Sequence, residues 1–294
     1  MASDFATNPT TSTSYDDTIY SAIITDMVLD ALMAAVVTPP LLAHYDLRNQ
    51  PSKAVDIPKA SKFTAAAVAE GVELQNTVLT TSKVTLTASE VGFQATITDV
   101  LEVSDIPAAH GARLRQIGRA MADKLDIDIA ALASGFSTTV GTSGADLGFQ
   151  DLLDAIFELE VENAPKPFVG VLHPVQISNL RNAAANQTVA VFPSSTGIQG
   201  GTNELGPAGN GFAGSWFGID IYFTTNVPEA NAGADRAGMI FSKGYALGMV
   251  EKWAAKVVPM YWPPLRAWVL TASAMYGVGE IEDAAGVKVV TAHE

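Results

Sequence analysis

The chain has 294 residues, of which 48% are hydrophobic and only 16% are charged. This composition supports one large or two smaller domains with a substantial core, and it excludes a chain that is disordered throughout. The formal net charge is −14, with 31 acidic against 17 basic residues. That balance argues against a dedicated nucleic-acid binder, which needs a basic surface. There is no cysteine, so disulfides, thiolate catalysis and cysteine-ligated metal sites are excluded.

The N-terminal part of the sequence predicts an arm followed by a helix. Residues 1–14 are rich in serine and threonine and do not have the pattern of a secretory signal. Apolar residues near helical spacing predict a helix over residues 16–37, which the prolines at 39–40 end. Two aspartates and these prolines interrupt the apolar stretch 19–43, so it does not read as a bilayer-spanning helix and we expect no membrane partner.

A long segment of β character, residues 53–98, follows. Apolar and polar residues alternate clearly over 82–98, and a strand of that length would extend roughly 50 Å at ~3.3 Å per residue. A compact domain of this size has a radius of gyration of only about 19 Å. We therefore expect this arm to project from the body and to lie on another copy of the chain. Residues 59–81 are predicted to form its tip, with a turn at Glu70 and Gly71.

Residues 107–133 predict a long amphipathic helix. Asp105 suits the N-cap and Pro107 the first turn. Apolar residues recur every three or four positions, at Leu114, Ile117, Met121, Leu125, Ile129 and Leu132. The charged residues lie in the opposite order to the one the helix dipole favours, namely Arg113, Arg115 and Arg119 before Asp123, Asp126 and Asp128. We therefore expect these charges to have partners outside the helix.

The second half of the chain predicts a mixed α/β region after a linker. Residues 134–148 are rich in glycine, serine and threonine and form the clearest domain boundary, and residues 194–214 predict a long loop. The predicted elements are helices at 149–162 and 174–185 and strands at 168–172, 219–224, 237–242, 245–249, 267–276 and 287–291.

Motifs of catalysis are sparse. None of the four histidines has a second one at metal-ligand spacing, and His173 before Pro174 reads as a helix cap. No nucleophile elbow, P-loop or dinucleotide fingerprint is present. We expect no catalytic residue, no cofactor and no metal, although a glycosidase carboxylate pair stays open because its members can be distant in sequence.

Aromatic residues cluster late, at Trp253, Tyr261, Trp262 and Trp268, with prolines among them. The favoured interpretation is a rigid, packed connection to the closing strand. A platform for carbohydrate stays open as an alternative.

The order of these segments resembles the major capsid proteins of tailed bacteriophages, which have the Hong Kong 97 fold. That order is an N-terminal arm, an extended loop, a spine helix, a Gly-rich hinge, an α/β region and a closing strand. Local sequences that also resemble this family lie at residues 83–99, 171–181, 218–228 and 238–249. The resemblance covers nearly the whole chain.

The resemblance implies an α+β fold of the Hong Kong 97 type with the following parts. They are an N-terminal arm and helix (1–52), an extended loop (53–82), a peripheral domain with the spine helix (83–140), an axial domain (141–255) and a C-terminal return to the peripheral domain (256–294).

The function that the resemblance implies is structural rather than enzymatic. Copies of the chain would assemble into hexamers and pentamers of an icosahedral head that encloses double-stranded DNA without sequence-specific binding. Further partners would be a portal protein and scaffolding or decoration proteins, and the location would be the virion, assembled in the host cytoplasm. The candidate intersubunit contacts are Arg113, Arg115, Arg119, Lys53, Lys59, Lys62, Glu70 and Glu73.

Two alternatives stay open at this point. The acidity and late aromatics fit a secreted hydrolase or carbohydrate-binding protein. The same fold would also serve an encapsulin-like, non-viral compartment shell.

Overall fold

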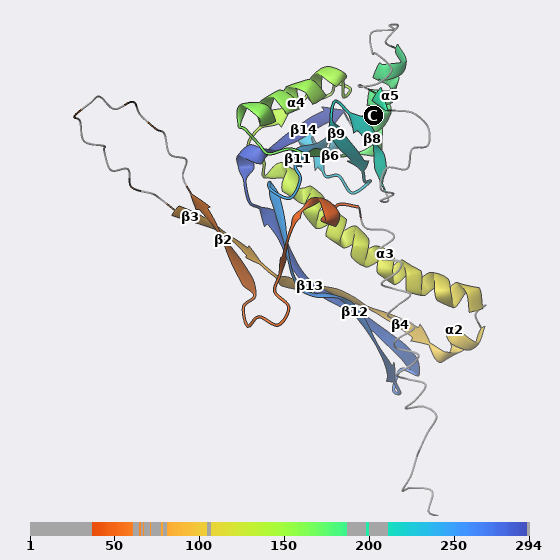
Figure 1. Ribbon diagram of the computed structural model, residues 1–294. Helices are drawn as coiled ribbons and strands as arrows, with labels where there is room; N and C mark the ends of the chain where they lie inside the picture. Colours follow the sequence, from red (N-terminus) through yellow and green to blue (C-terminus); the bar gives the residue numbers. More distant parts are fainter. Residues whose placement is uncertain are drawn as a thin grey trace, which may run out of the picture.

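The computed structural model describes residues 37–60, 81–104, 107–186, 198–199 and 211–292, and the single positions 65, 67, 71 and 78. This part of the chain forms three β-sheets with helices packed on them (Figure 1). The α-helices are α2 (Asp99–Ser104), α3 (Pro107–Ala131), α4 (Phe149–Val161) and α5 (Pro174–Asn186). Short 3-10 turns are η2 (Pro39–Leu41), η3 (Leu132–Ser134), η4 (Asn231–Gly233) and η5 (Asp283–Ala285).

An eight-stranded sheet forms the first body of the molecule. Its strands are β5 (Thr139–Val140), β6 (Phe168–Leu172), β7 (Ile198–Gln199), β8 (Phe212–Trp216), β9 (Ile219–Phe223), β10 (Glu229–Ala230), β11 (Asp235–Ser242) and β14 (Gly286–Ala292). All five residues of β6 are buried, as expected for a central strand covered on both faces. Leu152 and Leu159 of α4 belong to the same buried cluster as Ile221 and Val289, so α4 packs on this sheet.

A four-stranded sheet forms the second body, a long limb. Its strands, in spatial order, are β1 (Ala43–Asp46), β12 (Leu247–Trp262), β13 (Ala267–Glu280) and β4 (Ser89–Thr98). The helix α3 lies along this limb (Figure 1) and buries the predicted stripe against it, since Ile117, Met121, Leu125 and Ile129 share one core cluster with Leu270. The predicted spine helix is therefore confirmed, and η3 continues the chain where α3 ends.

A third, two-stranded sheet projects from the two bodies (Figure 1). It consists of β2 (Ala54–Ala60) and β3 (Thr81–Thr87), which pair antiparallel from Ala54 with Thr87 to Ala60 with Thr81. The prediction of one continuous strand over 82–98 is wrong in this respect. The strand breaks at Ala88, where β3 leaves for the projecting hairpin while β4 pairs with β13.

The predicted C-terminal return, residues 256–294, is divided between the two sheets, since β13 pairs with β4 in the limb whereas β14 does not. β14 pairs antiparallel with β11 and parallel with β5, so it belongs to the eight-stranded sheet. The physical reason is burial, because Val287 and Val289 pack into the same cluster as Leu152. The other domain boundaries stay predictions.

The remaining elements follow the sequence closely or lie outside the description. The strands predicted around Lys243 and Gly244 exist, but β11 and β12 join different sheets there. The linker 134–148 is tied down, since the carboxylate of Asp235 accepts hydrogen bonds from Ser143 Oγ at 2.6 Å and from the Gly144 amide at 2.9 Å. The predicted helix 16–37 and most of the loop 194–214 lie outside the described residues.

Candidate assembly surfaces

The β2–β3 hairpin is the first candidate surface. Its ribbon is held by polar contacts, with Lys83 Nζ 2.6 Å from Asp56 Oδ2 and Thr85 Oγ1 2.5 Å from Asp56 Oδ1. The hydrogen bond from Lys83 is the main reason that the pKa of Asp56 is lowered. Thr81, Ser82 and Lys83 are exposed. The hairpin is thus an ordered ribbon that extends away from both bodies.

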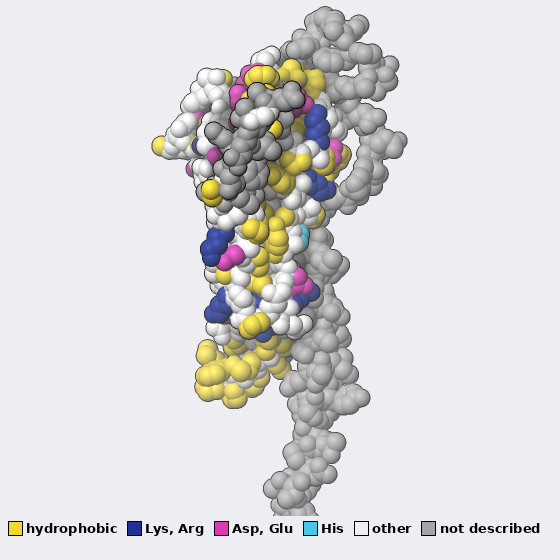
Figure 2. Space-filling view, turned by 60° about the vertical axis from the view of Figure 1, so that its left-hand side comes forward, with side chains coloured by type: hydrophobic (Ala, Val, Ile, Leu, Met, Phe, Trp, Pro, Cys, Tyr) yellow, Lys and Arg dark blue, Asp and Glu magenta, His cyan; other side chains and the backbone are white. Residues whose placement is uncertain are grey.

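A patch of exposed apolar side chains at the far end of the limb is the second candidate surface. We call it the limb-tip patch. Its members are between 39% and 76% exposed and are Val100, Leu101, Val258, Met260, Tyr261, Trp262 and Leu265. Figure 2 shows hydrophobic side chains gathered at the lower end of the described part, where the limb ends. Contiguous exposed apolar surface of this kind marks interaction sites.

The limb-tip patch is built on a fixed turn. The β12–β13 hairpin closes with Trp262 opposite Ala267, and within the turn the Leu265 amide donates to the Trp262 carbonyl at 3.1 Å. The Tyr261 hydroxyl donates to Asp99 Oδ2 at 2.8 Å, and this hydrogen bond is the main reason that the pKa of Tyr261 is raised. The patch is therefore held in place before any partner arrives.

The predicted packed connection around the late aromatics is wrong at this point, because Tyr261 and Trp262 are 39% and 45% exposed. Tyr261 meets Trp268 edge to face, with ring centroids 5.4 Å apart and an interplanar angle of 63°. Two rings at this angle do not form one flat stacking surface. A signal was present in the sequence, since apolar residues at both odd and even positions of 257–262 give a strand two apolar faces.

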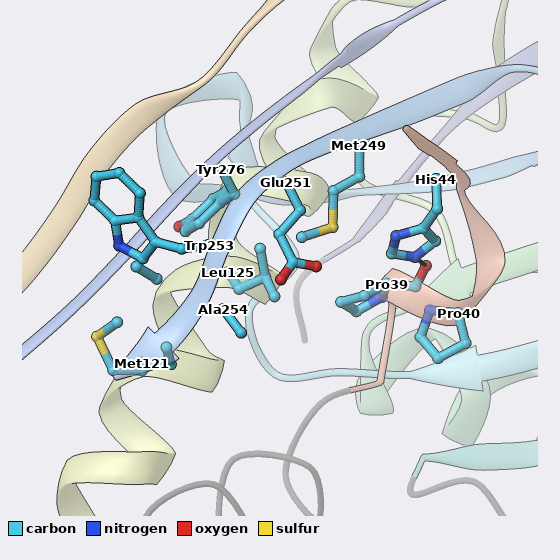
Figure 3. Close-up of a pocket in the computed structure, with 12 residues that line it drawn as sticks. Pro39, Pro40, His44, Met121, Leu125, Met249, Glu251, Trp253, Ala254 and Tyr276 are labelled. Atoms are coloured by element: carbon cyan, nitrogen blue, oxygen red, sulfur yellow. Dashed lines mark hydrogen bonds between the residues drawn. The ribbon is translucent and has the colours of Figure 1, made fainter. Parts of the chain in front are cut away.

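A cavity of about 510 Å³ lies between β12, β13, α3 and the segment of η2 and β1 (Figure 3). Its walls are mostly apolar, with Pro39, Pro40, Met121, Leu125, Met249, Trp253, Ala254, Ala255 and Ala274 beside His44, Glu251 and Tyr276. His44 Nε2 lies 3.0 Å from the Pro39 carbonyl, Glu251 pairs with Arg48, and the Tyr276 hydroxyl donates to Asp128 at 2.8 Å. Burial, more than this hydrogen bond, raises the pKa of Tyr276. The polar groups of the wall are thus engaged with neighbouring residues.

Comparison with known proteins decides the fold. No family model matches the sequence, and no curated protein matches it. Among solved structures, one from Mycobacterium phage Che8 aligns with a TM-score of 0.63 at 19% identity, covering 81% of this chain and 84% of that chain. A capsid structure of the cyanophage P-SCSP1u aligns with a TM-score of 0.61 at 16% identity, covering 89% of each chain.

The chain has the Hong Kong 97-type capsid fold. A virus-like particle from Pyrococcus furiosus also aligns, with a TM-score of 0.60 at 11% identity, covering 92% of this chain and 99% of that chain. The predicted α+β class and fold are confirmed.

Within this Hong Kong 97-type fold, the predicted contact residues fall in different places. Arg115 and Arg119 are exposed on α3, and Arg113 lies on the same helix with its side chain outside the description. Lys53 is exposed at the root of the hairpin, where its carbonyl accepts the Ala88 amide at 2.8 Å. Lys59 pairs with Glu282 of the same chain, with Nζ 3.0 Å from Oε2. The remaining candidates, which lie outside the described residues, are Lys62, Glu70 and Glu73.

Two of the later aspartates of α3, Asp126 and Asp128, have partners outside the helix, as the order of charges predicts, and these partners belong to the same chain. Asp126 is 3% exposed, and its Oδ1 accepts the Thr38 amide at 3.2 Å and the Thr38 hydroxyl at 2.5 Å. Asp128 accepts the Tyr276 hydroxyl and pairs with Lys124 at 2.5 Å. These contacts tie α3 to the beginning of the described chain and to β13.

His173 caps α5, as predicted. Its Nδ1 accepts the Val175 amide at 3.3 Å, and its own amide donates to Gln176 Oε1 at 3.0 Å. Among the residues that the structure describes, no three or more metal-ligating side chains gather. None of the helices in the described ranges is long and apolar enough to cross a membrane.

Proposed function

We propose that this chain is the major capsid protein of a tailed bacteriophage. Its copies assemble into hexamers and pentamers of an icosahedral head that encloses double-stranded DNA. The role is structural rather than enzymatic, and the protein resides in the virion after assembly in the host cytoplasm. A portal protein and scaffolding or decoration proteins are the expected further partners.

The observation that carries this proposal is the combination of a capsid fold with two surfaces that a lone subunit leaves open. The hairpin projects from the body, and the limb-tip patch exposes seven large apolar residues on α2, on the end of β12 and in the turn that follows it. In a shell each contact can be moderate, at ~1,600 Å² of buried surface per interface, because many act together. The net charge of −14 supports enclosure of DNA without tight binding to it.

Electron microscopy and sedimentation of the purified protein test the proposal. We expect closed shells under assembly conditions, and shells from infected cells should contain DNA. Shells that contain a protein cargo instead would favour a compartment, and a monomer under all conditions would contradict the proposal.

A variant pair makes the test specific. Trp262→Ser removes an exposed aromatic from the limb-tip patch, and we expect loss of shells without unfolding. Tyr245→Ser removes an equally exposed aromatic, 47% against 45%, from the turn between the two sheets, and shells should persist. An unchanged shell yield for Trp262→Ser would show that the limb-tip patch is not needed for the contacts between subunits.

A further inference from the structure

The root of the projecting hairpin fits into a notch of the limb that is lined by glycines. Gly248 of β12 and Gly279 of β13 lie directly opposite each other in the antiparallel pair. Leu86 of β3 lies over them. A Cβ atom at Gly279 would come within 2.5 Å of one Leu86 methyl, and a Cβ at Gly248 would come within 2.6 Å of Ile281 Cδ1 and 2.9 Å of the other Leu86 methyl. Both methyl groups therefore occupy space that any other residue would fill.

The neighbouring positions extend this close approach. A Cβ at Gly277 would overlap the Thr87 carbonyl, so the backbone of β3 also lies against β13. Leu86 is 4% exposed and belongs to a buried cluster with Leu47, Val250 and Met275. Because interiors pack at the density of organic crystals, such a fit leaves Leu86 little freedom to move.

A second contact holds the hairpin further out. Lys59 of β2 lies 3.0 Å from Glu282, and the two side chains are only 29% and 31% exposed. Glu282 itself is fixed, because its amide and that of Ile281 donate to the Ala246 carbonyl at 3.1 and 2.8 Å. This anchor lies at the connection between the two sheets.

The surroundings of Glu282 reinforce its attraction for Lys59. Burial and then Asp283 raise the pKa of Glu280, whereas Lys59 acts to lower it. Asp283 accepts the Ser137 amide at 2.8 Å. Lys59 thus lies near two carboxylates, Glu280 at the end of β13 and Glu282 just beyond it.

The two contacts together determine a direction. Leu86 pairs with Val55 across the hairpin, and Lys59 lies four positions further along β2, or about 13 Å at ~3.3 Å per residue. One contact would leave a ribbon free to swing about it. Two separated contacts fix its angle.

We propose that the β2–β3 hairpin is a preset arm, whose direction is fixed in the unassembled subunit by the Leu86 notch and the Lys59–Glu282 ion pair. The inference rests on the proposed function, because the arm is set for contact with a second copy of this chain. Ordering the arm in advance removes an entropic cost from each assembly contact. The described arm thus receives its order from its own subunit.

Distance measurements between two spin labels on the unassembled full-length chain test this proposal. The chain has no cysteine, so Thr81→Cys on the arm and Ser178→Cys on α5, both exposed, provide two unique labels. We expect one narrow distance distribution for the parent. Leu86→Ala and Lys59→Gln should each broaden the distance distribution. Gly279→Ala should move its maximum, because the added methyl group fills the notch.

Lys83→Gln is the matched control. It removes the ion pair with Asp56 inside the hairpin, leaves both attachments to the body untouched, and should keep the narrow distribution. Lys59→Gln changes a partly exposed side chain, so it keeps the test open should Leu86→Ala fail to fold. A broad distribution in the parent, or a narrow one in Lys59→Gln and Leu86→Ala alike, would overturn the proposal.

The measurement is independent of the proposed function, because it uses subunits that sedimentation shows to be monomeric. A parent with a fixed arm that never forms shells would contradict the capsid role and leave the preset arm standing. A parent with a mobile arm that forms shells would support the capsid role and contradict the preset arm.

Discussion

The eight-stranded body and the limb differ in how completely each buries its own apolar residues. In the eight-stranded body, β6 is buried at every position, and Ile219, Ile221 and Ile240 are 0% exposed. In the outer half of β12, Val257 is 5% exposed but its neighbour Val258 is 52% exposed. The central strands of the first region are thus buried within their own chain, although Leu153, Phe157 and Val161 of α4 and Phe223 of β9 are 40% to 62% exposed. The second ends in apolar surface that further chains can cover, so the two should respond differently to the same kind of substitution.

The largest expected effect separates the two regions directly. Ile221→Ala removes a fully buried side chain from the eight-stranded body, and we expect the free energy of unfolding to fall by about 2–5 kcal/mol. Val258→Ala at the limb tip should change it by no more than about 0.5 kcal/mol. Urea unfolding of both variants, unassembled, measures the difference. Equal losses would show that the limb tip is part of a core.

A smaller effect concerns Asp235, which ties the linker to β11. The hydrogen bond from Ser143, followed by that from Asn231, lowers the pKa of Asp235. A carboxylate whose folded-state pKa is lowered contributes stability that is present above its unfolded pKa of ~3.9 and is lost as the pH falls through the folded value. Asp235→Asn should therefore lower the melting temperature at neutral pH and flatten its acid dependence.

Thermal unfolding over a series of acid pH values measures this. Asp154→Asn, an exposed change on α4, serves as the control and should leave the profile unchanged. An Asp235→Asn profile parallel to that of the parent would mean that this carboxylate does not set the acid response.

Individual helices and strands could be predicted from the sequence, because the spacing of apolar residues that produces them spans only a few positions. The apolar run of β6 and the three-to-four spacing of α3 act within a few residues, and the structure has both elements where the patterns predict them. The resemblance in segment order likewise predicted the fold, because it depends on order rather than on contacts.

Pairing between distant segments could not be predicted in this way. The sequence around 287–291 predicts an apolar strand, but it does not predict that this strand, β14, pairs with β11 and β5. The Leu86 notch depends on Gly248 and Gly279 meeting across two strands, and Lys59 was identified as a contact residue without its partner Glu282. Each of these needs the register of two strands in three dimensions. The candidate sites were therefore less predictable than the elements that carry them.

The smallest expected effect lies where the limb's helix meets the beginning of the described chain. Burial, partly offset by hydrogen bonds from Thr38, raises the pKa of Asp126. A folded state that binds the proton more readily than the unfolded chain gains stability as the pH falls through the folded pKa, and loses it again as the pH rises. Both Thr38 hydrogen bonds end on Oδ1, and the Val37 backbone also donates to this carboxylate, so the carbonyl of an asparagine can keep the two Thr38 hydrogen bonds without a buried charge.

Asp126→Asn should therefore match or slightly exceed the parent in stability at neutral pH, and its stability should vary less between neutral and mildly acid solution. Asp126→Ala leaves both Thr38 donors without their acceptor and should lose stability at every pH, because an unsatisfied buried donor costs about 1–3 kcal/mol. Urea unfolding of the three proteins at several pH values distinguishes these outcomes. If Asp126→Asn loses as much stability as Asp126→Ala, the carboxylate itself is required, because the amide of an asparagine cannot replace it toward both Thr38 and the Val37 backbone.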